Sequence, residues 1–382
     1  MKHLEIYESL ADVQYDLSNN ILIKPYIALY DNRHKIEFDN DNDVIIIDNT
    51  NYNDMPLTFK ILESGSIIWK CSNSSISKTI QYKLNDGDWT SITSTTSGAN
   101  INVVTDDIIQ FKGNNNTYAN NNYYNYFSAT CNFTVYGNIM SLLFNDSFND
   151  KISISGKNYA FFSLFKGNTY IKNIKNLILP ATTLSDCCYK NMFLQCTGIQ
   201  GDAPILPAIS LTSECYRSMF NECTGITKAS PLPATNLAYM CYYFMYQKTA
   251  ISQAPTLSSM NLAEYCYACL FNGCSNLTIA PSLPATSLKR FCYTAMFEDC
   301  INLIQAPELI ATTLSHKCYE NMFINCSKLN YIYCAAADVS SDTYTSNWVN
   351  GVSPTGTFKK SSSANWSTGT SGIPSGWTIE NI

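Results

Sequence analysis

Residues 280–300 read APSLPATSLKRFCYTAMFEDC, and this stretch decides the fold. Similar segments stand before and after it, so it is one unit of a tandem repeat. Its Cys-Tyr pair recurs at spacings of 27, 26, 25, 26 and 26 residues, and the cysteines are Cys188, Cys215, Cys241, Cys266, Cys292 and Cys318. A second cysteine follows eight residues later in every unit but one, where Thr249 replaces it, and these are Cys196, Cys223, Cys274, Cys300 and Cys326.

An apolar pair, Met-Phe in most units, lies between the two cysteine columns. Its phenylalanines are Phe193, Phe220, Phe271, Phe297 and Phe323. We interpret Cys and Met-Phe, at i, i+4 and i+5, as one face of a helical turn, and the Leu-x-x-Ala-Pro-x-Leu stretch as a short strand. Units of this length cannot bury an apolar face alone, but stacked units share one core built from these columns. The repeat length is that of leucine-rich repeats.

The fold class expected is therefore mixed and β-rich: a leucine-rich-repeat solenoid over 146–335, preceded by a small β-sandwich and a short N-terminal helix-hairpin segment. Residues 1–54 are interpreted as an N-terminal anchoring segment and linker, and 336–382 as a C-terminal cap. Several short strand-like runs broken by turn signals favour an Ig-like sandwich over 55–145, and Asn-Asp-Gly-Asp at 85–88 predicts a hairpin.

A polar and aromatic loop, NNNTYANNNYYNYF at 114–127, is the one candidate ligand loop. Loops on a rigid scaffold often carry binding residues. The candidates are Tyr118, Tyr123, Tyr124 and Tyr126. The alternative is a mobile surface connection without a binding role.

Composition limits the function further. Apolar residues make up 46% of the 382, charged residues only 14%, and the net charge is −6. No basic cluster is available for phosphates, so we expect no nucleic-acid partner. No apolar run reaches the length of a membrane span. The first residues lack the apolar stretch of a signal peptide, and we expect the chain to be made in a cytoplasm, where thiols stay reduced.

The cysteines leave three interpretations open. Cys266, Cys269 and Cys274 are spaced like zinc ligands, and disulfides within a unit would need residues eight apart to approach closely. We favour stacked thiols that act as small hydrophobes, because Thr249 would leave Cys241 without a partner in a bridge. Accordingly no metal and no cofactor is expected.

Catalytic residues are not recognisable in the sequence. It has no Gly-rich phosphate loop, nucleophile elbow or Cys/His pairing. We therefore expect a protein that is not an enzyme. A glycan hydrolase with two carboxylates brought together by the fold stays open as an alternative.

The units CYRSMFNECTGI and APSLPATSLKRFCYTAMFEDC resemble the BspA-like (Treponema-type) leucine-rich repeats of gut Bacteroidales surface proteins. The resemblance covers about half of the chain, although the family repeat is slightly shorter and surface members carry secretion signals. KPYIALYDNRHKIEF near the start and TSNWVNGV with SGIPSGWTI near the end resemble segments of structural proteins of crAss-like phages infecting those bacteria.

These resemblances imply adhesion rather than catalysis. The expected protein lies on the virion surface as a head fibre, decoration or tail-associated protein, made in the host cytoplasm. Its expected partners are capsid or other virion proteins at the N-terminal segment and a bacterial surface or mucus glycan or protein; we also expect a homo-oligomer. The alternative is a BspA-like adhesin on the bacterial cell surface.

Overall fold

A computed structural model of the chain describes residues 4–6, 27–29, 34–38, 44–48, 51–337 and 342–381. The chain divides into two compact units, Met1–Tyr52 and Asn53–Ile382. Asn53–Ile382 is one compact unit, so the domain boundaries that the sequence predicts inside it stay predictions.

The first unit holds a four-stranded sheet in the order β1-β2-β3-β4. Its strands are β1 (Leu4–Ile6), β2 (Ile27–Leu29), β3 (His34–Phe38) and β4 (Val44–Asp48). β1 runs parallel to β2, and the later pairs are antiparallel. The predicted N-terminal helix is wrong where it can be examined, because Leu4–Ile6 forms β1; its other residues lie outside the described residues.

The second unit begins with two sheets. The described strands are β5 (Leu57–Ile61), β6 (Gly65–Cys71), β7 (Thr79–Leu84), β8 (Thr90–Thr93), β9 (Ala99–Val103), β10 (Ile108–Lys112), β11 (Asn125–Ala129), β12 (Phe133–Asn138), β13 (Ile171–Asn173) and β14 (Leu177–Ile178). Short helices lie at Tyr52–Asp54, Ser74–Ile76, Asn145–Ser147 and α2 (Ser141–Phe144). One sheet runs β13-β12-β5-β10-β7-β8 with β14 also on β12, and the other runs β11-β6-β9. The predicted hairpin around Asn85–Asp88 is confirmed, since β7 and β8 pair antiparallel.

Aromatic rings hold the two sheets together. Phe59 of β5 lies 4.8 Å from Phe111 and 5.1 Å from Phe127, and Trp69 lies 4.7 Å from Phe127. All four side chains are fully buried. The sandwich expected from the sequence is corrected in one respect: β13 and β14, from the start of the repeats, pair parallel with β12. The large sheet is therefore mixed, and it continues into the repeat region.

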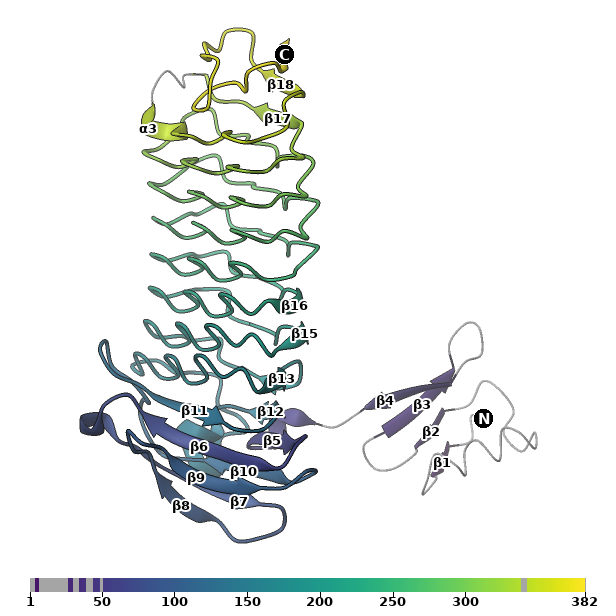
Figure 1. Ribbon diagram of the computed structural model, residues 1–382, viewed down its shortest axis with the longest axis vertical. Coiled ribbons are helices and arrows are strands. Elements are labelled where there is room, and N and C mark those ends of the chain that lie inside the picture. Colours follow the sequence, from purple (N-terminus) through teal and green to yellow (C-terminus); the bar gives the residue numbers. More distant parts are fainter. Residues whose placement is uncertain are drawn as a thin grey trace. The chain divides into compact units, whose positions relative to one another are not determined.

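The repeats follow one another as a stack of turn-rich coils, here called the repeat stack, residues 159–334 (Figure 1). Each coil carries three consecutive four-residue turns. In the coil of the opening segment, Phe291, Ala295 and Asp299 have φ of 57°, 50° and 62°. The N–H of Met296 and of Cys300 closes a turn on a carbonyl three residues back. The N–H of Tyr293 instead donates to the carbonyl of Cys318 in the next coil at 3.1 Å.

The leucine-rich-repeat solenoid expected from the sequence is therefore contradicted. The structure is β-rich with mixed and antiparallel sheets and few helices, and no described repeat unit has a helical segment. The i, i+4, i+5 spacing comes from a run of turns with a left-handed residue at every fourth position, not from a helix. The expected strand is also mostly absent. Among the described residues, β15 (Gln200–Asp202) and β16 (Gly225–Lys228) are the only two strands that pair between one repeat coil and the next. Later coils meet through single bridges such as Gln253 to Ile279, because proline cannot donate to a ladder.

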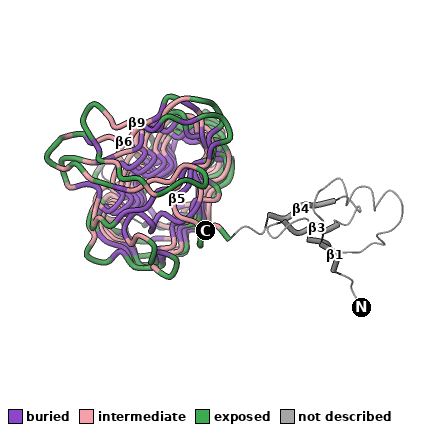
Figure 2. The backbone as a smooth tube through the Cα atoms, turned by 90° about the horizontal axis from the view of Figure 1, so that it is seen from below, coloured by how far each residue is buried: buried purple, intermediate pink, exposed green. Residues whose placement is uncertain are grey.

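Rings and thiols fill the interior of the repeat stack. The tyrosine column stacks ring on ring at 5.7–6.1 Å between centroids from Tyr189 to Tyr319. The phenylalanine column, in which Tyr246 is one member, does so at 5.6–6.3 Å from Phe193 to Phe323. Viewed along its length, the stack has buried residues inside and exposed ones outside (Figure 2). All 16 cysteines are free and buried.

The second cysteine column has a specific role. Each thiol donates to a carbonyl of the preceding coil at 2.9–3.1 Å: Cys196 to Phe165, Cys223 to Phe193, Cys274 to Tyr246, Cys300 to Phe271 and Cys326 to Phe297. Thr249 donates to the carbonyl of Tyr246 in its own coil instead. These thiols link neighbouring coils without a covalent bond.

The C-terminal residues cover the last coil. α3 (Asp342–Thr345) precedes Trp348, which stacks on Tyr319 at 6.2 Å and lies 6.0 Å from Phe323. β17 (Tyr331–Cys334), β18 (Thr357–Lys360) and β19 (Thr378–Asn381) form a parallel sheet. Trp348 Nε1 donates to the carbonyl of Gly372 at 2.8 Å, so the indole is both buried and satisfied.

Alkaline pH should destabilise the protein through these thiols. Burial raises the pKa of Cys196, Cys266 and Cys274 to about 12, whereas an unfolded thiol titrates at about 8.5. Because the folded pKa is the higher one, the stability is present below the unfolded pKa and is lost as pH rises toward the folded pKa. We expect the urea midpoint, measured with reductant, to be constant from about pH 7 to 8 and to fall from about pH 9. An unchanged midpoint up to about pH 10 would contradict this.

Candidate aromatic surface

The turn run alternates pairs of inward and outward residues. Cys-Tyr and Met-Phe point into the core. The residues between these pairs and just before Cys-Tyr are less buried, except for small ones such as Ser218, Ala268 and Ala295. On one face, outward residues contact one another from β11 to the seventh coil, which holds His316. We call this row the aromatic strip: Tyr126, Tyr124, Phe162, Lys190, Glu214, Arg217, Tyr243, Tyr265, Phe291 and His316.

The strip starts where β11 meets the first coil. Tyr126 and Tyr124 lie 5.4 Å apart, and Tyr124 lies 5.9 Å from Phe162 of the first coil. Lys190 of the next coil lies over the Phe162 ring at 5.9 Å. The predicted ligand loop is thus joined to the repeat stack at this junction.

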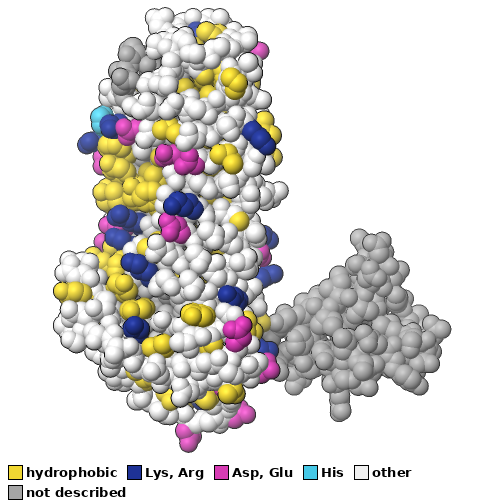
Figure 3. All heavy atoms as spheres, viewed as in Figure 1, with side chains coloured by type: hydrophobic (Ala, Val, Ile, Leu, Met, Phe, Trp, Pro, Cys, Tyr) yellow, Lys and Arg dark blue, Asp and Glu magenta, His cyan; other side chains and the backbone are white. Residues whose placement is uncertain are grey.

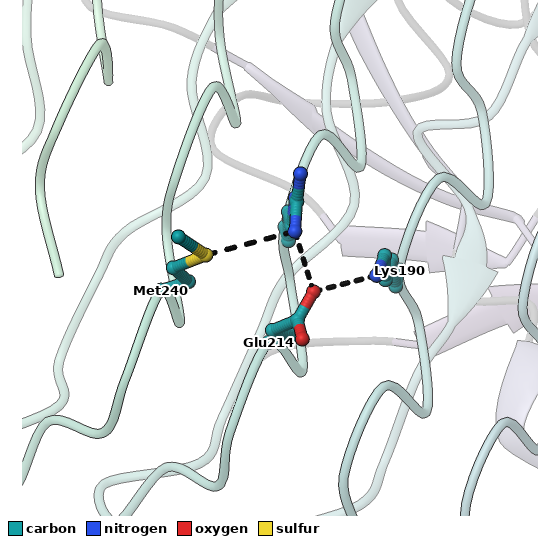
Figure 4. Close-up of polar contacts among 4 residues, drawn as sticks. Lys190, Glu214 and Met240 are labelled. Carbon is teal, nitrogen blue, oxygen red and sulfur yellow. Dashed lines mark hydrogen bonds and ion pairs between the residues drawn. The ribbon is translucent and has the colours of Figure 1, made fainter. Parts of the chain in front are cut away.

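Three charged residues form the middle of the strip (Figure 4). Glu214 Oε2 accepts from Lys190 Nζ at 2.5 Å and from Arg217 Nη1 at 2.8 Å. Arg217 Nη1 also lies 3.6 Å from Met240 Sδ. Partial burial acts to raise the pKa of the Glu214 carboxyl, but the two cationic donors outweigh it and hold that pKa below its usual range. The cluster is therefore an ordered ion-pair link between coils.

Aromatic rings continue the strip beyond Arg217. The guanidinium lies 5.1 Å over Tyr243, which is 6.1 Å from Tyr265. Tyr265 and Phe291 stack at 4.4 Å with an interplanar angle of 7°, and His316 meets Phe291 edge-on at 5.4 Å. Figure 3 shows hydrophobic side chains gathered along this edge of the repeat stack with charged ones around them.

Two rings of the strip stand at left-handed positions of the turn run, as Tyr159 and Phe244 outside the strip also do. Tyr265 and Phe291 both have φ of 57°, a region where bulky residues are rare. Asn321 and Gly273 occupy left-handed positions in other coils, at a lower conformational cost. Both rings are only half-buried, so core packing does not account for them. The positive φ belongs to the turn run as a whole, so it is their exposure that sets these two rings apart from the core rings.

The sequence-predicted residues divide into two groups. Every residue of the predicted repeat core is buried, with both cysteine columns and the phenylalanines at 0% exposure. They therefore lie away from the strip. Of the loop tyrosines, Tyr118 is fully buried and donates to the carbonyl of Leu142 at 2.6 Å, so it cannot meet a ligand. Tyr124 and Tyr126 belong to the strip, and Tyr123 is 38% exposed beside it in sequence.

Other parts of the described surface have fewer side chains that could bind a ligand. A groove of about 630 Å³ lies between Thr278–Pro284 and Ile304–Ile310, and Glu308 is the one titratable residue in its lining. No group of three or more His, Cys, Asp or Glu residues within the described ranges could hold a metal ion. The described part of the chain also has no helix long and apolar enough to cross a bilayer.

No family model, curated protein or solved structure matches this chain.

The sequence interpretation missed most of the strip. It followed the columns that recur, and the strip consists of positions that differ from unit to unit. A signal was present: Phe162, Tyr243, Tyr265 and Phe291 are aromatic residues outside the repeated columns. The coils of Tyr243, Tyr265 and Phe291 are adjacent, so these three rings meet on one face of the stack, while Phe162 is joined to them through the charged residues of the two coils between.

Replacing Glu214 with Gln should destabilise the fold by about 1 kcal/mol at neutral pH, since two charge-assisted hydrogen bonds are weakened at a partly exposed site. Urea unfolding at several pH values measures this. The folded pKa of Glu214 is lowered, so its contribution is present above the unfolded pKa and is lost as pH falls. The gap between parent and variant should therefore shrink below about pH 4.

Glu264→Gln is the matched control, because Glu264 is exposed and forms no ion pair among the described residues. Equal losses in the two variants would show that the Glu214 cluster is not a structural link.

Proposed function

We propose that this protein is a non-catalytic adhesion protein whose aromatic strip binds polysaccharide on a bacterial surface or in mucus. One observation carries the proposal: a continuous row of half-exposed side chains runs along one face from β11 to the seventh coil, with aromatic rings at both ends and the Lys190–Glu214–Arg217 cluster between them. A row is suited to an extended polymer rather than to a small enclosed ligand.

The chemistry of the rings supports a sugar ligand. The apolar C–H face of a pyranose ring stacks on an aromatic face, and its hydroxyls remain free for polar neighbours such as Arg217. Tyr243, Tyr265 and Phe291 come from three successive coils, which backbone hydrogen bonding spaces at about 4.8 Å. Contacts among the rings restrict their rotamers before binding, which lowers the entropy lost with a ligand.

A protein ligand is the second candidate, and one feature favours it. Tyr239, 44% exposed, and Met240 adjoin Arg217 and the Tyr265 ring, and tyrosine, methionine and arginine are enriched in protein interfaces. Binding to mucin before and after removal of its glycans separates the two candidates.

Alanine at both Tyr265 and Phe291 should weaken binding to mucin glycans or bacterial surface polysaccharide about tenfold or more, since two central rings are removed. Alanine occupies another left-handed position of the same turn run at 295, with φ of 50°, so this backbone conformation accepts alanine. Binding is measured by biolayer interferometry, with thermal unfolding as a check of the fold.

Tyr170→Ala provides the control, because Tyr170 is 38% exposed and lies outside the strip. Loss of binding in this control as large as in the double variant would count against the strip, as would unchanged binding in the double variant.

For the place of display we propose the virion surface, with residues 1–54 as the anchor to capsid or other virion proteins. This proposal is supported by the resemblance of the two ends of the chain to phage structural proteins. A cell-surface adhesin is the alternative.

Antibodies against the repeat stack should therefore label purified virions of phages that infect gut Bacteroidales. Electron microscopy with gold-labelled antibody gives the answer. Labelling of uninfected bacterial cells with none on virions would favour the cell-surface adhesin.

A further inference from the structure

The two ends of the aromatic strip differ in charge. At the far end Lys317 is paired with Glu320 at 2.7 Å. Arg290 also lies there, 5.7 Å over Phe291, but the carboxylates of Glu264 and Glu320 act on the adjacent Tyr265 together with it, so its charge is offset. In the middle Lys190 and Arg217 share Glu214. At the junction end Lys166 lies over Tyr124 at 5.5 Å and Lys70 over Tyr126 at 5.9 Å, and neither lysine forms an ion pair with any residue that the structure describes.

We infer that this junction end, formed by Lys70, Lys166, Tyr124 and Tyr126, is a subsite for an anionic sugar, one that bears a carboxylate or a sulfate. The inference rests on the proposed polysaccharide binding and specifies the class of polymer: acidic rather than neutral.

Geometry supports the assignment. The two rings lie 5.4 Å apart, so both ammonium groups are held above one aromatic pair. Both lysines are half-buried, which places them against the rings rather than free in solvent. A sugar stacked beside these rings would bring its substituents close to two cations at once.

The charges around the junction end also support an anionic ligand. The chain carries a net charge of −6, so an acidic polymer is repelled by the molecule as a whole and attracted only where cations are left uncompensated. Asp186 and Glu214, acidic residues of the adjoining coils, act on Tyr159 and Cys187. Glu214 is already neutralised by two cations, so its field at the junction is small.

The test compares three polymers on the full chain: dextran, which is neutral, dextran sulfate and polygalacturonate. The parent should bind one or both acidic polymers more tightly than dextran, and high salt should reduce the difference. The variant Lys70→Gln with Lys166→Gln should lose about tenfold on the preferred acidic polymer, the size expected for a charged hydrogen bond, and should bind dextran as the parent does.

Two further variants serve as controls. Lys70→Arg with Lys166→Arg keeps the charge and should keep the preference. Lys228→Gln with Lys328→Gln removes two exposed lysines outside the strip and should change nothing. A preference for carboxylate or for sulfate identifies the anion.

The outcomes separate the two proposals. Binding to dextran equal to that of the acidic polymers, or full acidic binding by the double Gln variant, overturns the subsite and leaves the strip as a neutral-glycan surface. Absence of binding to every polymer and to mucin glycans overturns the proposed function together with the subsite.

Discussion

Hydrogen bonds between successive coils hold the repeat stack together, and they depend on a left-handed residue at every fourth position. With this alternation, each turn closes on itself through one N–H and offers the next N–H to the neighbouring coil, as Met296 and Tyr293 do. The register between coils follows directly. Because these hydrogen bonds join equivalent atoms of successive coils, they also place equivalent rings over one another. The tyrosine and phenylalanine columns are aligned for this reason. Each fully buried ring then adds roughly 2–3 kcal/mol of hydrophobic stabilisation.

The repeated columns allowed the residues of the interior to be predicted from the sequence. The backbone conformation of these columns could not be predicted in the same way. Residues at i, i+4 and i+5 share one side of a helix, and they also share one side of a run of four-residue turns. The two differ in φ at every fourth residue, and in this chain that residue is rarely glycine: Asp299, Asn321 and Gln195 all adopt positive φ. Without a glycine signal the sequence favoured the helix, and the turn run could be recognised only from the structure.

The mixed sheet escaped prediction for a different reason. β13 and β14 are three and two residues long, and they pair with β12 from more than thirty positions away in sequence. No local periodicity marks such short segments. Their effect is large nonetheless, because they cover the edge of β12 and join the first coil to the sheet. An uncovered edge would be free to pair with another chain. The same junction brings Tyr124 against Phe162, so the start of the aromatic strip depends on it.

The aromatic strip is possible because the inward and the outward positions of each unit are under different constraints. Inward positions must be nearly the same in every coil, because each ring lies on its counterpart. Outward positions meet no such demand and can differ, as Arg217, Tyr243 and Thr294 do at equivalent places. At outward left-handed positions the local preference is for glycine or asparagine, and an aromatic residue there costs roughly 1–3 kcal/mol. Tyr265 and Phe291 bear that cost in adjacent coils, stacked at 4.4 Å and left half-exposed. Neither the core nor the turn needs a ring at these two positions, so their stacking on one exposed face agrees with the polysaccharide binding proposed above.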